Sequence, residues 1–158
     1  MAKNLERFNL AALYFLGKAY DEHPIPVTVQ RAEILDVIAP MPGEDEARES
    51  EDRENASVEV AYTFYFLAQN DYLLPMTPLN AGGWRLVLKD KGLLALKKST
   101  LADPSETLGD RAKKWMADIT TAGLKEGAKK AGTELLDQIL NAGSWFQSGV
   151  HTSGITSV

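Results

Sequence analysis

Apolar residues recur every three or four positions between about residues 5 and 20, which is the spacing of one face of a helix. The residues on this face are Leu5, Phe8, Ala12, Phe15 and Ala19. Pro24 and Pro26 end the pattern, because neither proline can continue helical hydrogen bonding. The pattern therefore predicts a first helix whose apolar side faces the core.

The spacing of apolar residues changes twice in the next segment. Ile25, Val27 and Val29 alternate with polar residues, as in a short strand. A second helix is predicted over residues 30–39, and the Pro-Met-Pro sequence that begins at Pro40 ends it. Residues 43–56 contain no aliphatic or aromatic residue larger than alanine. This acidic stretch is therefore expected to be a solvated loop that adds nothing to the core.

A third helix is expected to begin near Ser57, and its residues separate into two faces at 100° per residue. The inward face consists of Ser57, Val60, Ala61, Phe64, Leu67 and Ala68. The outward face carries Glu59, Tyr62, Phe66 and Gln69. The third helix therefore has a core side and a second side on which two aromatic residues lie one turn apart.

A hairpin is predicted after this helix. The sequence Asn80-Ala-Gly-Gly supplies glycines for a tight turn between two short strands, Tyr72–Leu74 and Trp84–Leu88. Pro75 and Pro78 imply that the first of these strands is short or at an edge. A short helix is predicted to follow over residues 89–98.

The composition shifts after residue 98, and a linker over 99–105 leads into a helical segment over 106–142. Ser105 can cap its first helix. Two sets of apolar residues lie more than a quarter turn apart, so two helices broken near residues 121–123 are expected. These sets are Leu108, Ala112, Trp115, Met116 and Ile119, then Leu124, Ala128, Ala131, Leu135 and Ile139. Residues 143–158, rich in Ser, Thr and Gly, are expected to form a flexible tail.

The composition is ordinary for a folded domain, with 44% hydrophobic and 25% charged residues in a chain of 158. One domain with an appendage is expected from this length. The longest apolar run, Leu10 to Leu16, is far shorter than the about 20 residues of a membrane-spanning helix. The first residues lack the layout of a secretory signal, and cysteine is absent. A cytoplasmic protein that does not bind membranes is therefore expected.

Charge is distributed unevenly along the chain. Between Glu44 and Glu59, eight acidic residues and two arginines give a net charge of −6, whereas the whole chain carries −5. Residues 85–98 carry a net charge of +4. Their basic residues are Arg85, Lys89, Lys91, Lys97 and Lys98. A local basic spot therefore follows an acidic segment.

The order of the predicted elements over residues 5–98 resembles the winged helix-turn-helix superfamily. The likeness is carried by Thr63-Phe-Tyr-Phe-Leu-Ala-Gln-Asn-Asp-Tyr-Leu and by Leu88-Lys-Asp-Lys-Gly-Leu-Leu-Ala-Leu, which are similar to segments of small bacterial winged-helix proteins. The resemblance implies an α+β fold, mainly α. Residues 1–98 would form a winged helix of three helices and a short β-hairpin wing, with C-terminal helices after it.

In that superfamily the third helix usually enters the DNA major groove with Arg, Lys, Asn or Gln side chains. Here no Lys or Arg occurs from Ser57 to Leu74, and an acidic segment precedes the helix, which disfavours phosphate contact. The aromatic pair Tyr62 and Phe66 favours protein binding if it stays exposed, and belongs to the core if other segments cover it. We therefore expect a non-enzymatic module that binds a protein partner through the outward face, including Glu59 and Gln69.

The alternative function is a dimeric DNA-binding transcriptional regulator that contacts nucleic acid through its wing. Its contacts would come from Arg85, Lys89, Lys91, Lys97 and Lys98. The same residues can instead be solvated charges around a hairpin and a helix end. In both hypotheses residues 106–141 are expected to pack on the domain or to pair with a second copy, which would make the protein a homo-oligomer.

Catalysis has little support in this sequence. Neither of the two histidines, His23 and His151, lies near a plausible arrangement of a serine together with an acid in the sequence. The acidic run lacks the glycine-punctuated spacing of a calcium loop, and no Cys or His cluster indicates zinc. No catalytic residue, metal site or cofactor is therefore predicted.

Overall fold

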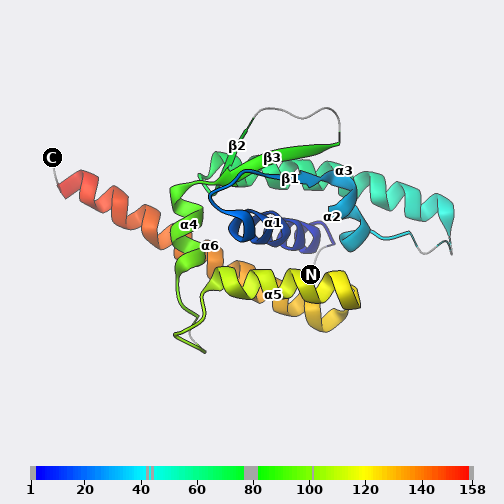
Figure 1. Ribbon diagram of the computed structural model, residues 1–158. Helices are drawn as coiled ribbons and strands as arrows, with labels where there is room; N and C mark the ends of the chain where they lie inside the picture. Colours follow the sequence, from blue (N-terminus) through cyan, green and yellow to red (C-terminus); the bar gives the residue numbers. More distant parts are fainter. Residues whose placement is uncertain (1–2, 42, 44, 77–81, 101, 157–158) are drawn as a thin grey trace.

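The computed structural model describes residues 3–41, 43, 45–76, 82–100 and 102–156, with residues 3 and 145–156 described by their backbone alone. Within these residues the chain is mainly helical and carries one small antiparallel sheet, so the predicted α+β class, mainly α, is confirmed. The elements are α1 (Lys3–Glu22), β1 (Val27–Gln30), α2 (Arg31–Ile38), α3 (Glu46–Gln69), β2 (Leu73–Pro75), β3 (Gly83–Leu88), α4 (Asp90–Lys97), α5 (Leu108–Ala122) and α6 (Glu126–Thr156) (Figure 1).

The sheet has the strand order β1-β3-β2, so the second strand of the hairpin lies in its centre. Val29 pairs with Trp84 on β3, and Leu73 of β2 pairs with Leu88. Gly83 lies so close to β1 that a Cβ atom there would come within 2.6 Å of the Val29 carbonyl oxygen. The tip of the predicted turn, Asn80-Ala81, lies outside the described residues.

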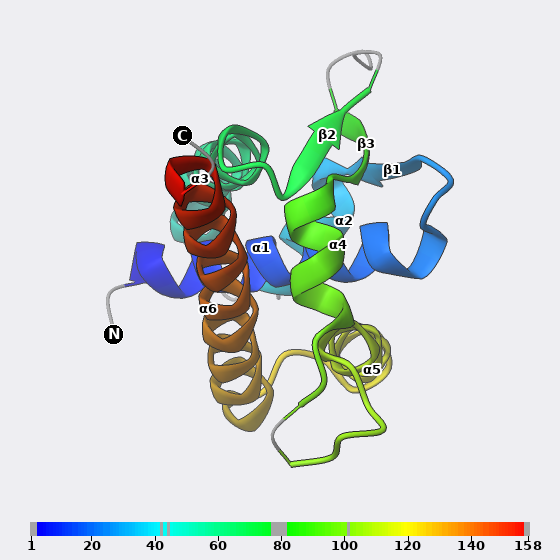
Figure 2. The ribbon, with the colours of Figure 1, turned by 90° about the vertical axis from the view of Figure 1, so that its left-hand side faces the viewer.

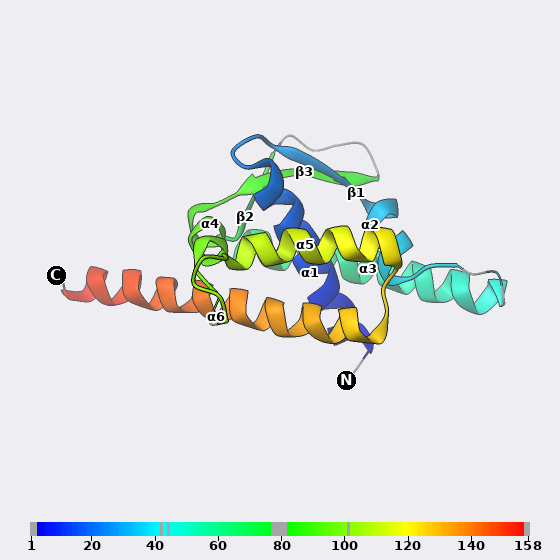
Figure 3. The same ribbon diagram turned by 60° about the horizontal axis from the view of Figure 1, so that its bottom comes forward.

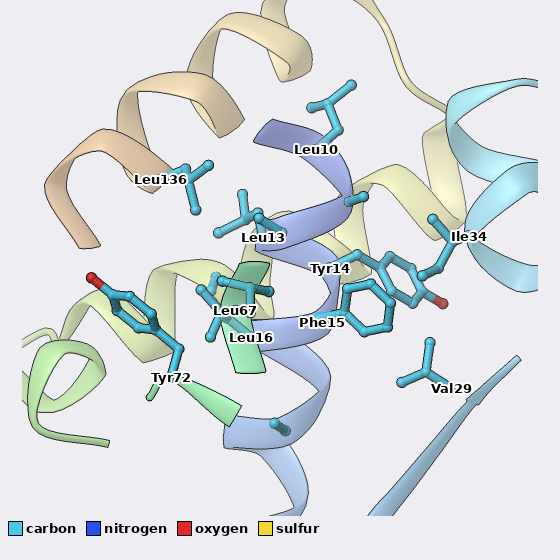
Figure 4. Close-up of a cluster of buried hydrophobic side chains, with 14 of the residues drawn as sticks. Leu10, Leu13, Tyr14, Phe15, Leu16, Val29, Ile34, Leu67, Tyr72 and Leu136 are labelled. Carbon is cyan, nitrogen blue, oxygen red and sulfur yellow. The ribbon is translucent and has the colours of Figure 1, made fainter. Parts of the chain in front are cut away.

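Helix α1 forms the centre of the core, with α3 and the sheet on one side and α5 and α6 on the other (Figures 1 and 2). Every residue from Asn9 to Gly17 is buried, whereas the sequence pattern predicted a single buried face. Leu5, which was expected in the core, is half exposed near the start of the helix. A helix covered from several directions is apolar all round, which a one-faced pattern does not describe (Figure 4).

The expected loop over residues 43–56 is wrong from residue 46 onward, because α3 already begins at Glu46. Asp45 caps this helix by accepting a hydrogen bond from the Arg48 backbone N–H. The guanidinium of Arg7 on α1, only 6% exposed, binds Asp52 at 2.5 Å and Glu59 at 2.9 Å. The acidic segment is therefore held against the core by a residue distant in the sequence.

The two predicted C-terminal helices are confirmed, and their break lies at Gly123, whose φ of 84° suits glycine. The N-cap of α5 is Thr107 rather than the predicted Ser105, because Thr107 and Asp110 form a reciprocal capping box. Helix α6 packs on α1, α4 and α5.

The tail expected from residue 143 begins inside α6. Gly143 is buried, and a Cβ atom there would come within 2.2 Å of the Tyr72 hydroxyl. The backbone continues as a helix to Thr156, and its last turns extend beyond the rest of the chain at the end opposite the first turns of α3 (Figures 1 and 3). Gly143 therefore belongs to the packed body rather than to a tail.

Candidate protein-binding face

The outer side of α3 carries a row of exposed apolar side chains. Val58 is 52% exposed, Tyr62 70%, Tyr65 57% and Phe66 38%. Together with exposed Gln69 they lie on one side of the helix, because the spacings from Val58 to Tyr62, Tyr65 and Gln69 are those of neighbouring helical turns. We call these five residues the α3 stripe. Exposed aromatic residues in a row are uncommon on a surface that binds nothing.

The opposite side of α3 fixes the helix in the body. Phe64 stacks on Trp84 with ring centroids 5.3 Å apart, and Phe15 of α1 meets the Trp84 ring edge-on at the same distance. Val60 and Leu67 are fully buried beside this aromatic group. The α3 stripe is therefore presented by a helix whose position is set by core packing.

The structure distributes the predicted partner-binding residues over two environments. Tyr62 and Gln69 are exposed, and Phe66 is partly exposed with its ring edge-on to Phe8 at 5.1 Å. Glu59 is half-buried, and its carboxylate accepts a hydrogen bond from Arg7 at 2.9 Å. Glu59 therefore lies at the edge of the face and serves the attachment of α3 to α1.

Sequence reasoning missed two members of the stripe, Val58 and Tyr65. The signal was present, because Val58, Tyr62, Tyr65 and Gln69 are separated by four, three and four residues. The predicted outward face instead had Tyr62 at its centre and Glu59 at one edge. In the structure, the carboxylate of Glu59 binds the largely buried Arg7 instead of facing outward.

The first half of α3 is acidic on the same side. Glu51 and Glu54 are both exposed, and Glu51 lies seven residues before Val58, which is close to two helical turns. Figure 1 shows the first turns of α3 extending past α2. The helix as a whole contains six acidic and two basic residues. One side of α3 therefore changes along its length from acidic to aromatic.

The five predicted basic residues are distributed from β3 to the end of α4. Lys89 binds Asp71 at 3.0 Å, and the ammonium group of Lys91 lies 4.6 Å from the centre of the Tyr72 ring. Arg85 is exposed on β3, and Lys97 and Lys98 are exposed at the far end of α4. These basic residues are therefore spread along β3 and α4 and do not cluster at the tip of the hairpin.

A cleft of about 1110 Å³ lies between α1, α2 and α5. The Tyr14 hydroxyl donates a hydrogen bond to Glu33 at 2.7 Å, and Lys18 lies 3.5 Å from the same carboxylate oxygen. Burial and the neighbouring Glu33 raise the pKa of the Tyr14 hydroxyl well above its ordinary value. At the rim Lys113 binds Asp21 at 3.1 Å. Glu33 with Lys18 and Asp21 with Lys113 therefore form ion pairs within the lining of the cleft.

The apolar residues expected to support self-association are largely buried inside one chain. Leu108, Ala112, Trp115, Ile119, Leu135, Leu136 and Ile139 all belong to the core. The Trp115 indole N–H donates to the Ala128 carbonyl at 2.8 Å, which joins α5 to α6. Of the two uses that the sequence left open for these helices, packing on the domain is the one observed, and the homo-oligomer stays a prediction.

The described residues contain no group of three or more His, Asp or Glu side chains arranged to hold a metal ion. No helix in the described part of the chain combines the length and the hydropathy that crossing a membrane requires. No family model matches this chain, and no curated protein and no solved structure matches it either.

Proposed function

We propose that this protein is a non-enzymatic, winged-helix-like interaction module that binds another protein through the α3 stripe. The observation that carries the proposal is the exposure of Val58, Tyr62 and Tyr65 in one row on a helix that core packing holds in place. Tyrosine supplies a large contact area at a low entropic cost and is enriched among the residues that dominate binding energy.

The winged-helix part of the proposal is supported by topology. The elements follow the order α1-β1-α2-α3-β2-β3, and the hairpin strand β2 contacts α3. The same order underlies the resemblance over residues 5–98. In that superfamily α3 would be the recognition helix, so the stripe occupies the position from which such domains contact their targets.

The alternative, a dimeric DNA-binding regulator, has the same topology in its favour together with exposed Arg85. Its weakness is the charge of α3, where exposed Glu51 and Glu54 would approach the phosphates. Lys89 and Lys91 are already engaged with Asp71 and Tyr72. Binding of a protein partner is therefore better supported than binding of DNA.

Photo-crosslinking in the cells that naturally make this protein tests the proposal. p-Benzoylphenylalanine in place of Tyr62 should join the chain to a discrete protein band on irradiation. The same group in place of Leu94, which is 45% exposed on α4, is the matched control. The Tyr62 band should disappear when Tyr65→Ser is added, because Tyr65 lies on the same face. Bands of equal pattern from both positions would contradict the proposal.

The DNA alternative is tested with the purified chain and a fluorescent random-sequence duplex. Anisotropy at low salt should show no binding, and the triple variant Arg85→Glu, Lys89→Glu, Lys91→Glu should behave like the parent protein. Binding that falls steeply with salt and is lost in this variant would favour the DNA regulator instead, because such a slope counts neutralised phosphates.

A further inference from the structure

We infer that the partner is a basic amphipathic helix, which lays apolar residues on the α3 stripe and Lys or Arg side chains beside Glu51 and Glu54. This inference rests on the proposed function, and adds the chemistry of the partner to it. It follows from the spacing of the exposed residues and from the charge on the same side of α3.

The spacing favours a helix as the partner. The line of exposed positions along the middle of this side consists of Glu51, Glu54, Val58, Tyr62, Tyr65 and Gln69, with exposed Asn55 and Phe66 beside it. The positions of the line are separated by three or four residues throughout, which is the spacing of the seam between two paired helices. This face is about 27 Å long at the usual rise of a helix, so a partner helix of about 18 residues would cover it.

The charge of α3 favours a basic partner. Six acidic and two basic residues give the helix a net charge of −4. Asp52 and Glu59 share the guanidinium of Arg7, whereas the exposed Glu51 and Glu54 lie in line with Val58. A partner with Lys or Arg at one end of an apolar seam would match both halves of this face, and the charges would fix its direction.

A second copy of this chain fits the face less well. In an antiparallel pair that sets Val58 against Tyr62 of the other copy, Glu51 would face Gln69 and stay unmatched. In a parallel pair the same glutamates would face each other, which is unfavourable. The chain's own basic residues on β3 and α4 are not part of this side of α3. Neither arrangement supplies cations to Glu51 and Glu54.

A peptide titration tests the inference. The probe is a fluorescein-labelled amphipathic peptide of about 18 residues with leucine at the seam positions and lysine beside them. The control probe carries glutamate in place of every lysine. Fluorescence anisotropy with the full chain should show binding of the lysine peptide, weaker at higher salt, and at least about tenfold weaker binding of the glutamate peptide.

Two pairs of variants locate the binding. The double variant Glu51→Lys, Glu54→Lys should weaken binding of the lysine peptide at least about tenfold, which is about 1.4 kcal/mol. The matched control is Glu134→Lys, Asp137→Lys on α6, which reverses two exposed acids at the same spacing and should change binding less than about twofold. Tyr62→Ser, Tyr65→Ser should weaken binding like the α3 charge reversal, and Leu94→Ser should leave it unchanged.

The outcomes separate this inference from the proposed function. Equal weakening by the α3 and α6 charge reversals would overturn the inference, because only the net charge would matter. An effect of the tyrosine pair without an effect of Glu51 and Glu54 would also overturn it, while the proposed function would stand. No binding of the lysine peptide at millimolar concentration overturns it too. A dimer in light scattering that Tyr62→Ser dissociates would assign the face to a second copy instead.

Discussion

The α5–α6 pair and the outer side of α3 both present aromatic residues on helices, yet only the first is covered within the chain. Trp115 of α5 is 6% exposed, because α6 returns across it and Gly132 lies against its ring. Tyr62 of α3 is largely exposed. A row of apolar residues therefore does not reveal by itself whether it serves folding or binding. What decides is whether another segment of the same chain comes back over it.

The covered side, at Trp115, is where a substitution should destabilise the fold most. Trp115→Ala should lower the free energy of unfolding by about 3–5 kcal/mol, because it removes a buried indole and leaves a cavity between α5 and α6. The indole N–H also loses its hydrogen bond to the Ala128 carbonyl. Equilibrium unfolding in urea measures this loss. A change below about 1 kcal/mol would show that α6 does not cover Trp115 in solution.

A smaller loss is expected where the acidic half of α3 meets α1. Arg7→Met should cost about 2 kcal/mol, because a buried guanidinium no longer binds Asp52 and Glu59. In this variant, backbone hydrogen exchange over residues 46–56 should become faster than in the parent protein, since the first turns of α3 lose their attachment. Exchange over residues 60–67 should change less. Arg111→Met, at a more exposed ion pair with Glu106, is the control and should cost less than about 0.5 kcal/mol.

The end of the packed body of α6 can be tested at Gly143. Gly143→Ala should destabilise by about 1–2 kcal/mol, because the new Cβ would overlap the Tyr72 ring. Gly127→Ala lies on the same helix with open space around it and should cause no loss. Thermal unfolding of the two variants compares them directly. If both alanines are tolerated equally, Gly143 belongs to a tail and not to the covered region.

The sequence predicted most elements because their signals are local. The spacing of apolar residues located α1 and the second half of α3, the glycines near residue 82 located the hairpin, and the change of helical phase located the break at Gly123. The spacing of apolar residues could not predict the acidic start of α3, because residues 46–56 contain no apolar residue larger than alanine. Its one local signal is the Asp45 cap, and its ion pair with the core comes from Arg7, which lies 45 residues before Asp52 and leaves no pattern near it.

The candidate site was predicted in part for the same reason. Helical geometry placed Tyr62 and Gln69 on the outward face, and both are exposed. It could not show that Glu59 turns to Arg7 or that Phe66 rests against Phe8, because these contacts join α3 to a helix far away in the sequence. Tyr65 needed no such contact. It could have been found from the spacing alone.

The smallest expected effect is on the uncovered side. The double variant Tyr62→Ser, Tyr65→Ser should change the free energy of unfolding by less than about 0.5 kcal/mol, because two largely exposed rings have little packing to lose. Phe66→Ser should cost more, about 1 kcal/mol, since it removes the edge-on contact with Phe8. Urea unfolding of both variants, measured together with Trp115→Ala, gives the three losses in free energy of unfolding on one scale. A loss of 2 kcal/mol or more in the tyrosine variant would mean that these rings stabilise the fold, so that their exposure would no longer indicate a partner.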